Sequence, residues 1–107
     1  MRRGDLFRVR SPSGDPKKSR VFVLVARPAA IESSYSTLIC APVFTNRGGI
    51  STQVDVGPDE GLKHASTIHC DNLSSIPRSH LTDYIGTLSP AAIARLDRAL
   101  RTALALE

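Results

Sequence analysis

The chain has 107 residues, which suffices for one domain over residues 1–107 with a modest core and is too short for two. Lys and Arg outnumber Asp and Glu by 14 to 10, and the net charge of +4 favours a polyanionic partner through electrostatic steering and counterion release. No stretch approaches the roughly 18 consecutive apolar residues of a membrane span, so we expect no membrane association.

The first half of the chain predicts three strands. Residues 5–10 alternate apolar and charged side chains, which is typical of a half-buried strand. Residues 21–26 have no polar face and predict a central strand covered on both sides. Residues 28–32 predict an irregular or single-turn connector, and residues 37–44 a third strand. Pro42 removes a backbone donor there, which predicts an edge position or a bulge.

The second half continues the same pattern. Residues 46–49 predict a turn, after which residues 52–56 alternate as a fourth strand. Two further short strands are expected at residues 66–71 and 81–88, with a bend over residues 74–79 between them. The sequence thus predicts a series of short strands joined by tight turns.

The final segment is the clearest helix. Ser89 can cap its first turn, and Pro90 suits its first position. Four apolar residues recur at helical spacing, and three arginines occupy the other face: Ile93, Leu96, Leu100 and Ala103 against Arg95, Arg98 and Arg101. The predicted fold is mainly β with a C-terminal α-helix: a compact, strongly curved antiparallel sheet closed by that helix.

The two cysteines and the start of the chain bear on location. Cys40 and Cys70 lie in apolar strand contexts without a CxxC partner, so we interpret them as reduced core thiols, with a disulfide as the alternative. No apolar run of signal-peptide length follows the first residues. We therefore expect a cytoplasmic protein.

Familiar cofactor and metal motifs are missing from the sequence. There is no glycine-rich phosphate loop, dinucleotide fingerprint or nucleophile elbow, which argues against nucleotide cofactors and serine hydrolase chemistry. His64, His69, Cys70 and Asp71 are capable of binding metal, but they show no standard ligand spacing. We expect no cofactor and no metal.

Arg20 stands at the mouth of the apolar strand, beside a loop over residues 11–19 that is rich in Pro, Gly, Ser and Lys. An arginine at the rim of a buried strand can bind a phosphate, because its planar guanidinium group donates two hydrogen bonds at once. From the residues alone, a solvated cation that merely flanks the strand is an equal alternative.

Four short motifs in the same order resemble the MazF/PemK/Kid family of toxin endoribonucleases along nearly the whole chain. They are Arg3-Gly4-Asp5-Leu6, Arg20 with its strand, residues 41–46 (Ala-Pro-Val-Phe-Thr-Asn), and Leu88-Ser89-Pro90. The resemblance implies a small SH3-like barrel, a homodimer and a cognate antitoxin of a type II toxin–antitoxin system. It also implies cleavage of single-stranded RNA without a metal, to a cyclic phosphate and a 5′-hydroxyl end.

The resemblance assigns catalytic roles to Arg20, which would hold the scissile phosphate, and to Thr45, which lies in the family's hydroxyl pair at the end of the third strand. This chain departs from the family at two positions. Phe44 replaces the first hydroxyl, and Ser74 stands where many relatives carry a second arginine. From the residues alone, a turn hydroxyl bonded to its own backbone is the alternative for Thr45.

The missing arginine leaves proton transfer to be assigned, and His69 and His64 are the candidates. If the strand alternates, Asp71 shares a face with His69 and orients its ring. An ordinary strand or loop residue is the alternative for each histidine, and we interpret His80 as structural. Substrate binding is expected from eight residues: Lys17, Lys18, Ser19, Phe44, Asn46, Arg47, Ser66 and Asp71.

Phe44 is open to two interpretations, a base-stacking side chain or a core residue. Two other function classes also stay open. Gyrase-poisoning toxins share the fold but depend on an aromatic C-terminal end, whereas this chain ends in Leu104-Ala105-Leu106-Glu107. A catalytically dead barrel that binds RNA or regulates its own operon is the other.

Overall fold

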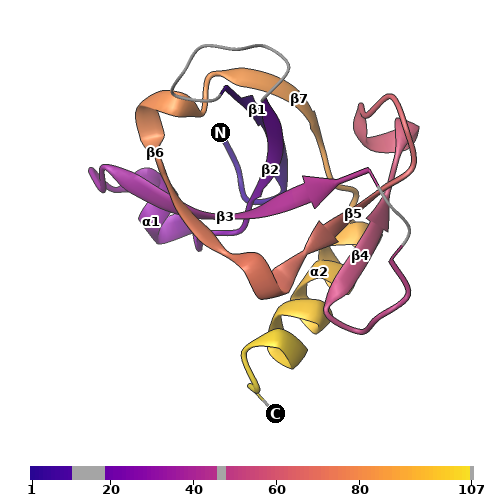
Figure 1. Ribbon diagram of the computed structural model, residues 1–107. Helices are drawn as coiled ribbons and strands as arrows, with labels where there is room; N and C mark the ends of the chain where they lie inside the picture. Colours follow the sequence, from indigo (N-terminus) through magenta and orange to yellow (C-terminus); the bar gives the residue numbers. More distant parts are fainter. Residues whose placement is uncertain (11–18, 46–47, 107) are drawn as a thin grey trace.

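A computed structural model describes residues 1–10, 19–45 and 48–106, and Figure 1 shows a sheet of strongly curved antiparallel strands with a helix packed against one side. Within these ranges the seven strands are β1 (Asp5–Val9), β2 (Arg20–Leu24), β3 (Thr37–Phe44), β4 (Gln53–Val56), β5 (Ser66–His69), β6 (Ser74–Pro77) and β7 (Asp83–Thr87). They pair in the order β4-β5-β3-β2-β1-β7, and β6 pairs with β3. The predicted fold class is confirmed.

Helical segments occupy the connections and the C-terminal region. The α-helices are α1 (Pro28–Glu32) and α2 (Pro90–Ala103), and 3₁₀ turns occur at η2 (Pro58–Glu60), η3 (Cys70–Asn72) and η4 (Arg78–His80). The short α1 matches the single-turn connector expected there. None of the helices in the described part of the chain is long and apolar enough to cross a membrane.

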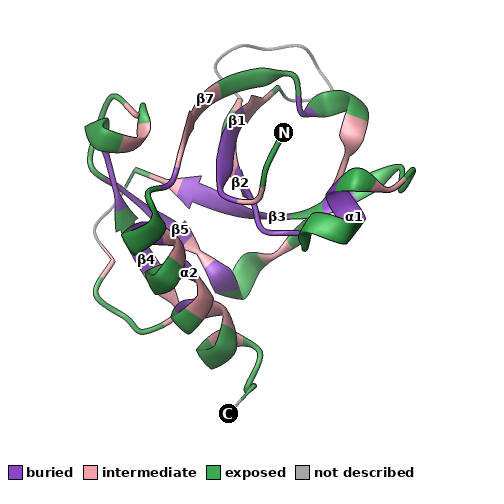
Figure 2. Ribbon diagram, turned by 180° about the vertical axis from the view of Figure 1, so that it is seen from behind, coloured by how far each residue is buried: buried purple, intermediate pink, exposed green. Residues whose placement is uncertain are grey.

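Two hydrophobic clusters lie on opposite sides of the sheet. Between the sheet and α2 lies the first, around Val23, Ile68 and Leu96, whose side chains are fully buried. The second includes Leu24 and Cys40 and packs under α1. Alternate residues of β2 thus enter different clusters, which confirms that this strand is covered on both sides; the buried segments appear purple in Figure 2.

Helix α2 begins as the sequence predicts. The Ser89 hydroxyl accepts a hydrogen bond from the Ala92 N–H at 3.1 Å, and Pro90 occupies the first turn. Leu96 is buried, whereas Arg95, Arg98 and Arg101 are exposed, so the apolar and basic faces are confirmed.

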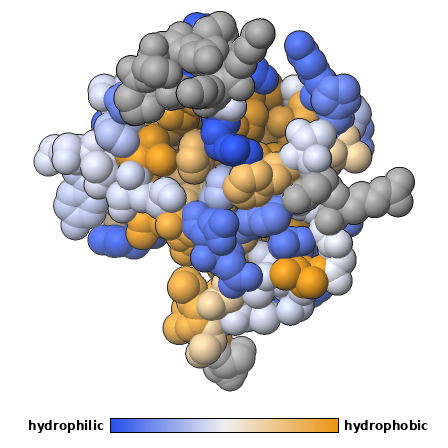
Figure 3. All heavy atoms as spheres, viewed as in Figure 1, coloured by the Kyte–Doolittle hydropathy of each residue, from blue (hydrophilic) through white to orange (hydrophobic). Residues whose placement is uncertain are grey.

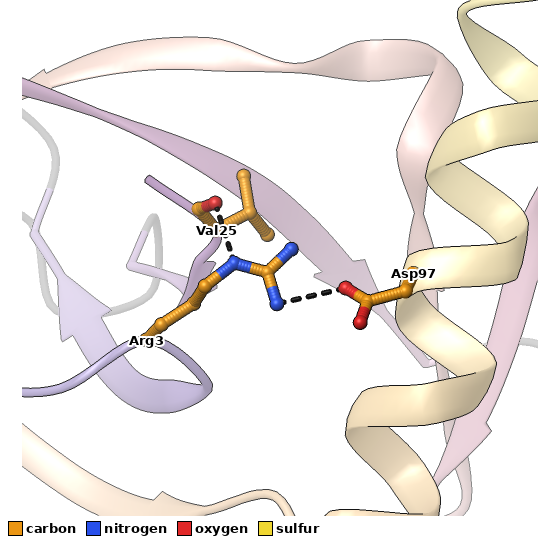
Figure 4. A network of polar contacts seen from close by, with 3 residues as sticks. All are labelled: Arg3, Val25 and Asp97. Atoms are coloured by element: carbon orange, nitrogen blue, oxygen red, sulfur yellow. Dashed lines mark hydrogen bonds and ion pairs between the residues drawn. The ribbon is translucent and has the colours of Figure 1, made fainter. Parts of the chain in front are cut away.

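An N-terminal arginine ties α2 to the sheet. Arg3 forms an ion pair with Asp97 of α2, with 2.8 Å between Nη1 and Oδ1, and its Nε donates to the Val25 carbonyl at 3.1 Å (Figure 4). One side chain therefore bridges the helix and the chain segment that follows β2. These contacts link the helix to the N-terminal segment and to the end of β2.

Two predictions were wrong, and both concern β3. Pro42 lies in a central strand and not at an edge, and the register of β3 against β2 runs through Pro42 without a bulge. On its other side β3 pairs with β6 up to Cys40 and with β5 from Val43, so Pro42 falls where the partner changes. The bend expected over residues 74–79 is instead β6 followed by η4, because β3 supplies a partner that the sequence Ser-Ser-Ile-Pro does not reveal.

The cysteines are buried and unpaired, which confirms their assignment as core thiols. Burial raises the pKa of Cys40 to about 12. Burial also raises the pKa of Cys70 to about 11, and the negative charge of Asp71 adds to the effect. Neither thiol is therefore a ready nucleophile near neutral pH.

Candidate active site

The candidate site lies on the face of β3, β4 and β5 that points away from α2. Phe44 of β3 pairs with Thr67 of β5, and His69 of β5 pairs with Gln53 of β4. Their neighbours along each strand, such as Val43, enter the cluster under α2. Because successive side chains of a strand point to opposite faces, these four share the other face.

Arg20, at the start of β2, completes this arrangement. In Figure 1 the helix lies behind β5, and Figure 3 shows the same open face, where hydrophilic side chains surround a hydrophobic spot near the middle of the sheet. The site is therefore a surface on the sheet and not an enclosed cavity.

Phe44 is the centre of this surface. The guanidinium carbon of Arg20 lies 4.2 Å from the centroid of the Phe44 ring, a cation–π contact. The His69 ring meets the same phenyl ring edge to face, with 4.5 Å between centroids and 71° between planes. Phe44 is half-buried, so it is neither a full core residue nor a free stacking surface. Its ring contacts a cation and an imidazole at the same time.

The cation remains available for an external anion. Arg20 is exposed, and among the described residues no carboxylate forms an ion pair with it. Its position is set by the aromatic contact and by the first backbone pairing of β2, in which Arg20 stands opposite Val9. An exposed guanidinium that is oriented but not neutralised is suited to binding a phosphate.

His69 is held at both ring nitrogens. Nε2 lies 3.0 Å from the hydroxyl oxygen of Thr67, and Nδ1 lies 3.5 Å from the amide nitrogen of Gln53. Thr67 is completely buried. The predicted role of Asp71 in orienting this ring is not what the structure shows: β5 ends at His69, and the Asp71 carboxylate accepts a 2.6 Å hydrogen bond from the Thr52 hydroxyl.

The other predicted residues fall into three groups. Thr45 is exposed directly after Phe44, and Ser19 is half-buried directly before Arg20, so both flank the site. His64 and Ser66 do not join it: Ser66 is buried, with its hydroxyl donating to the His64 carbonyl at 2.9 Å. The remaining four, Lys17, Lys18, Asn46 and Arg47, lie outside the described residues.

Sequence reasoning missed three residues of this surface: Gln53, Thr67 and Gly48. A Cβ at Gly48 would stand 2.7 Å from Cγ2 of Thr67, 2.9 Å from Oε1 of Gln53 and 3.3 Å from Oδ1 of Asp55. Only glycine allows the backbone to approach these side chains so closely. The pair Gly48-Gly49 indicated a turn, but nothing local indicated what the turn would touch.

Two further observations delimit the site. Among the described residues, no three His, Cys, Asp or Glu side chains come together in a way that could hold a metal ion. A groove of about 680 Å³ lies between the N-terminal arginines, η2 and the start of α2, and it shares no residue with the surface around Phe44. The chemistry-bearing side chains thus gather away from this groove.

Comparison with known proteins gives a consistent result. Residues 2–104 match the model of PemK-like, MazF-like toxins of type II toxin–antitoxin systems. Endoribonuclease MazF4 of Mycobacterium tuberculosis is 32% identical over 69 residues. The match covers 64% of this chain and 64% of the relative, which is less than two thirds of the relative's length. The probable endoribonuclease MazF of Mycolicibacterium smegmatis is 26% identical over 102 residues, covering 94% of this chain and 93% of the relative.

A solved structure shows the same likeness in three dimensions. An endoribonuclease in complex with its cognate antitoxin, from a mycobacterial species, superposes with a TM-score of 0.85 and 26% identity. The match covers 100% of this chain and 97% of that one.

Proposed function

The chain belongs to the PemK-like, MazF-like toxins of type II toxin–antitoxin systems, and on that premise we propose that it is a metal-independent endoribonuclease that cleaves single-stranded RNA at selected sequences. The observation that carries this proposal is the Phe44 ring, which has Arg20 over its face and the His69 ring in edge-to-face contact with it. An exposed cation and an imidazole on one ring support the proposal, because the first is suited to binding a phosphate and the second to transferring protons.

The reaction begins at the ribose 2′-hydroxyl. Its oxygen attacks the adjacent phosphorus, the bond from phosphorus to the 5′-oxygen breaks, and a 2′,3′-cyclic phosphate and a 5′-hydroxyl end are formed. One proton leaves the 2′-hydroxyl, and one proton is added to the departing 5′-oxygen. The active site therefore needs a proton acceptor, a proton donor and a positive charge beside the phosphoryl oxygens.

Arg20 supplies the positive charge. Its guanidinium hydrogen bonds to the non-bridging oxygens strengthen as negative charge grows on them in the transition state. Because the contact with Phe44 holds the cation before the substrate arrives, less of the binding energy is needed to order it. Thr45, which is exposed directly after Phe44, supplies a hydroxyl that orients the same phosphate.

His69 is the proton-transfer group that this geometry favours. Its ring contacts the phenyl ring that carries Arg20, whereas His64 sits in an exposed loop without a described contact to that ring. Imidazole accepts and releases protons near neutral pH, so one side chain can serve both steps. This assignment compensates for Ser74, which offers no cation where many relatives carry an arginine.

The partners follow from charge and family. A net charge of +4 and an exposed arginine on an open sheet face suit single-stranded RNA, with Lys17, Lys18, Asn46 and Arg47 expected along its backbone. We also infer a homodimer and a cognate antitoxin. An acidic or amphipathic tail of that antitoxin would cover the open face around Arg20 and block RNA.

The decisive experiment is cleavage of a long RNA in excess EDTA, with analysis of both new ends. Wild-type protein should cut at a small set of sequences and leave cyclic phosphate and 5′-hydroxyl ends. Arg20→Ala should lower kcat/KM by a factor of roughly 100 to 1000, since one oxyanion-stabilising donor contributes about that much. Arg101→Ala, which removes an exposed arginine of α2, is the matched control and should cut normally.

Several outcomes would contradict the proposal. Intact RNA in every sequence context, or cutting only with added metal, would overturn the activity itself. RNA binding without cutting would identify a catalytically dead barrel, and inhibition of DNA supercoiling would identify a gyrase poison. An Arg20→Ala variant with full activity would overturn the role of Arg20 alone.

A further inference from the structure

His69 has two ring partners, and both are groups that can donate or accept a hydrogen bond. Nε2 faces the Thr67 hydroxyl at 3.0 Å, and Nδ1 faces the Gln53 side-chain amide at 3.5 Å. We propose that Gln53 is a positioning residue, which acts through His69 by keeping Nδ1 free of a proton in the resting protein. The inference rests on the proposed function, in which His69 is the proton acceptor.

The chemistry of the amide assigns the proton. In this orientation the Gln53 nitrogen faces Nδ1, and because an amide nitrogen only donates hydrogen bonds, the arrangement matches an Nδ1 that accepts. The single proton of the neutral ring then lies on Nε2, which donates to the Thr67 oxygen. The other end of the amide faces Gly48, where an added Cβ would stand 2.9 Å from Oε1 of Gln53.

The surroundings keep the ring in this orientation. The His69 ring meets Phe44 edge to face, Thr67 is completely buried beside it, and Gln53 stands directly opposite in the pairing of β4 with β5. Of the two nitrogen contacts, the one to Gln53 is at the long limit for a hydrogen bond, while the one to Thr67 has ordinary length. Nδ1 is therefore the nitrogen that a ribose hydroxyl can claim by displacing Gln53.

An amide at residue 53 suits a ring that changes charge. After His69 has taken a proton on Nδ1, the Gln53 amide can turn so that its oxygen accepts the new N–H. A carboxylate at the same place would favour the charged ring, so a smaller fraction of the ring would be in the unprotonated form that can accept a proton. The charged groups of the described residues around the ring are Arg20 across Phe44, Asp55 on β4 and Asp71 in η3, whose carboxylate is bonded to Thr52.

The test compares Gln53→Glu with Gln53→Met, a variant of similar length that cannot form the hydrogen bond. Ring nitrogen shifts measured by NMR report which nitrogen of His69 carries the proton, without any RNA. Wild-type protein should show the neutral ring protonated at Nε2, and Gln53→Met should show both tautomers. In Gln53→Glu the titration of this ring should move up by roughly one pH unit, while exposed His64 and His80 stay unchanged as internal controls.

Cleavage supplies a second readout. A base works only while unprotonated, so activity is lost as the pH falls through the titration of His69, and Gln53→Glu should move that loss to higher pH by the shift seen in NMR. Gln53→Met should lower kcat about tenfold with little change in KM, as expected of a residue that orients a catalytic group.

The two readouts separate the possible failures. A wild-type ring protonated at Nδ1, or an unmoved titration in folded Gln53→Glu, would overturn the positioning role. The expected NMR result together with intact RNA would support the positioning of the ring and overturn the proposed function. A rate loss that follows KM and leaves the pH profile unmoved would also overturn the role assigned to Gln53.

Discussion

The two faces of β3, β4 and β5 are built from alternate residues of the same strands, yet different interactions hold them. On the α2 side, Val43, Val54 and Ile68 are buried together against the helix. On the open side, half-buried Phe44 and His69 are held by one cation, two ring nitrogen contacts and an aromatic edge. Apolar burial contributes much of the folding free energy and does not depend on the orientation of the groups, whereas polar and aromatic contacts contribute less but fix the orientation of the side chains. Stability and chemistry are thus expected to separate by face.

The strongest test of this separation is Leu96→Ala, on the covered face. Leu96 is fully buried in α2, so the variant should lose about 2 to 5 kcal/mol of unfolding free energy through lost burial and a new cavity. Urea unfolding measures the loss. The fraction that remains folded should cleave RNA at the normal rate, and a tenfold loss of rate in that folded fraction would break the division between the faces.

The next effect is expected from Phe44→Leu, on the open face. Loss of the ring releases both Arg20 and His69, so kcat/KM should fall about tenfold, equal to about 1.4 kcal/mol. Stability should change by less than about 1.5 kcal/mol, because the side chain is half-buried and the volume is nearly kept. Steady-state cleavage and urea unfolding together measure both quantities.

Phe7→Leu is the matched control for that experiment. Phe7 is a phenylalanine of the second cluster, buried and in edge contact with Tyr84, and it has no described contact with Arg20 or His69. Its replacement should lower stability and leave the cleavage rate unchanged. Equal activity losses in the two variants would show that Phe44 acts through packing alone.

The smallest expected effect concerns the link between Arg3 and Asp97. The two side chains are 24% and 38% exposed, so solvent screens the ion pair, and a double-mutant cycle should give a coupling of roughly 0.2 to 1 kcal/mol that decreases with added salt. Arg3→Ala should cost more than Asp97→Ala, because it also removes the bond to the Val25 carbonyl. Neither change should alter cleavage, since the link belongs to the covered side.

Short-range patterns carried most of the fold prediction. The apolar run of β2, the alternation of β4 and the Ser89 cap of α2 are each encoded within a few residues, and all were confirmed. Two failures, Pro42 in a central strand and the unrecognised β6, share one cause. Both depend on where β3 changes its partner, and that exchange involves segments some 30 residues apart in the chain.

The candidate site divides in the same way. Arg20 and His69 were identified from the sequence as residues with suitable chemistry. For Phe44, the sequence left two interpretations open, a core residue or a base-stacking side chain. The partner expected for His69 was Asp71, two residues along the chain, whereas the partners found are Thr67 on the same strand and Gln53 on the neighbouring one. The end of β5 at His69 turned Asp71 toward Thr52, and no local pattern marks that end.

By itself, the sequence determined most of the strands, the amphipathic helix and the position of an arginine at the start of an apolar strand. These follow from side-chain periodicity and capping, which act over one or two turns of backbone. Only the tertiary structure decided that Arg20 and His69 share one phenyl ring and that Gln53 faces the histidine. Such contacts arise from strand register, and register is fixed by the burial of the opposite face against α2.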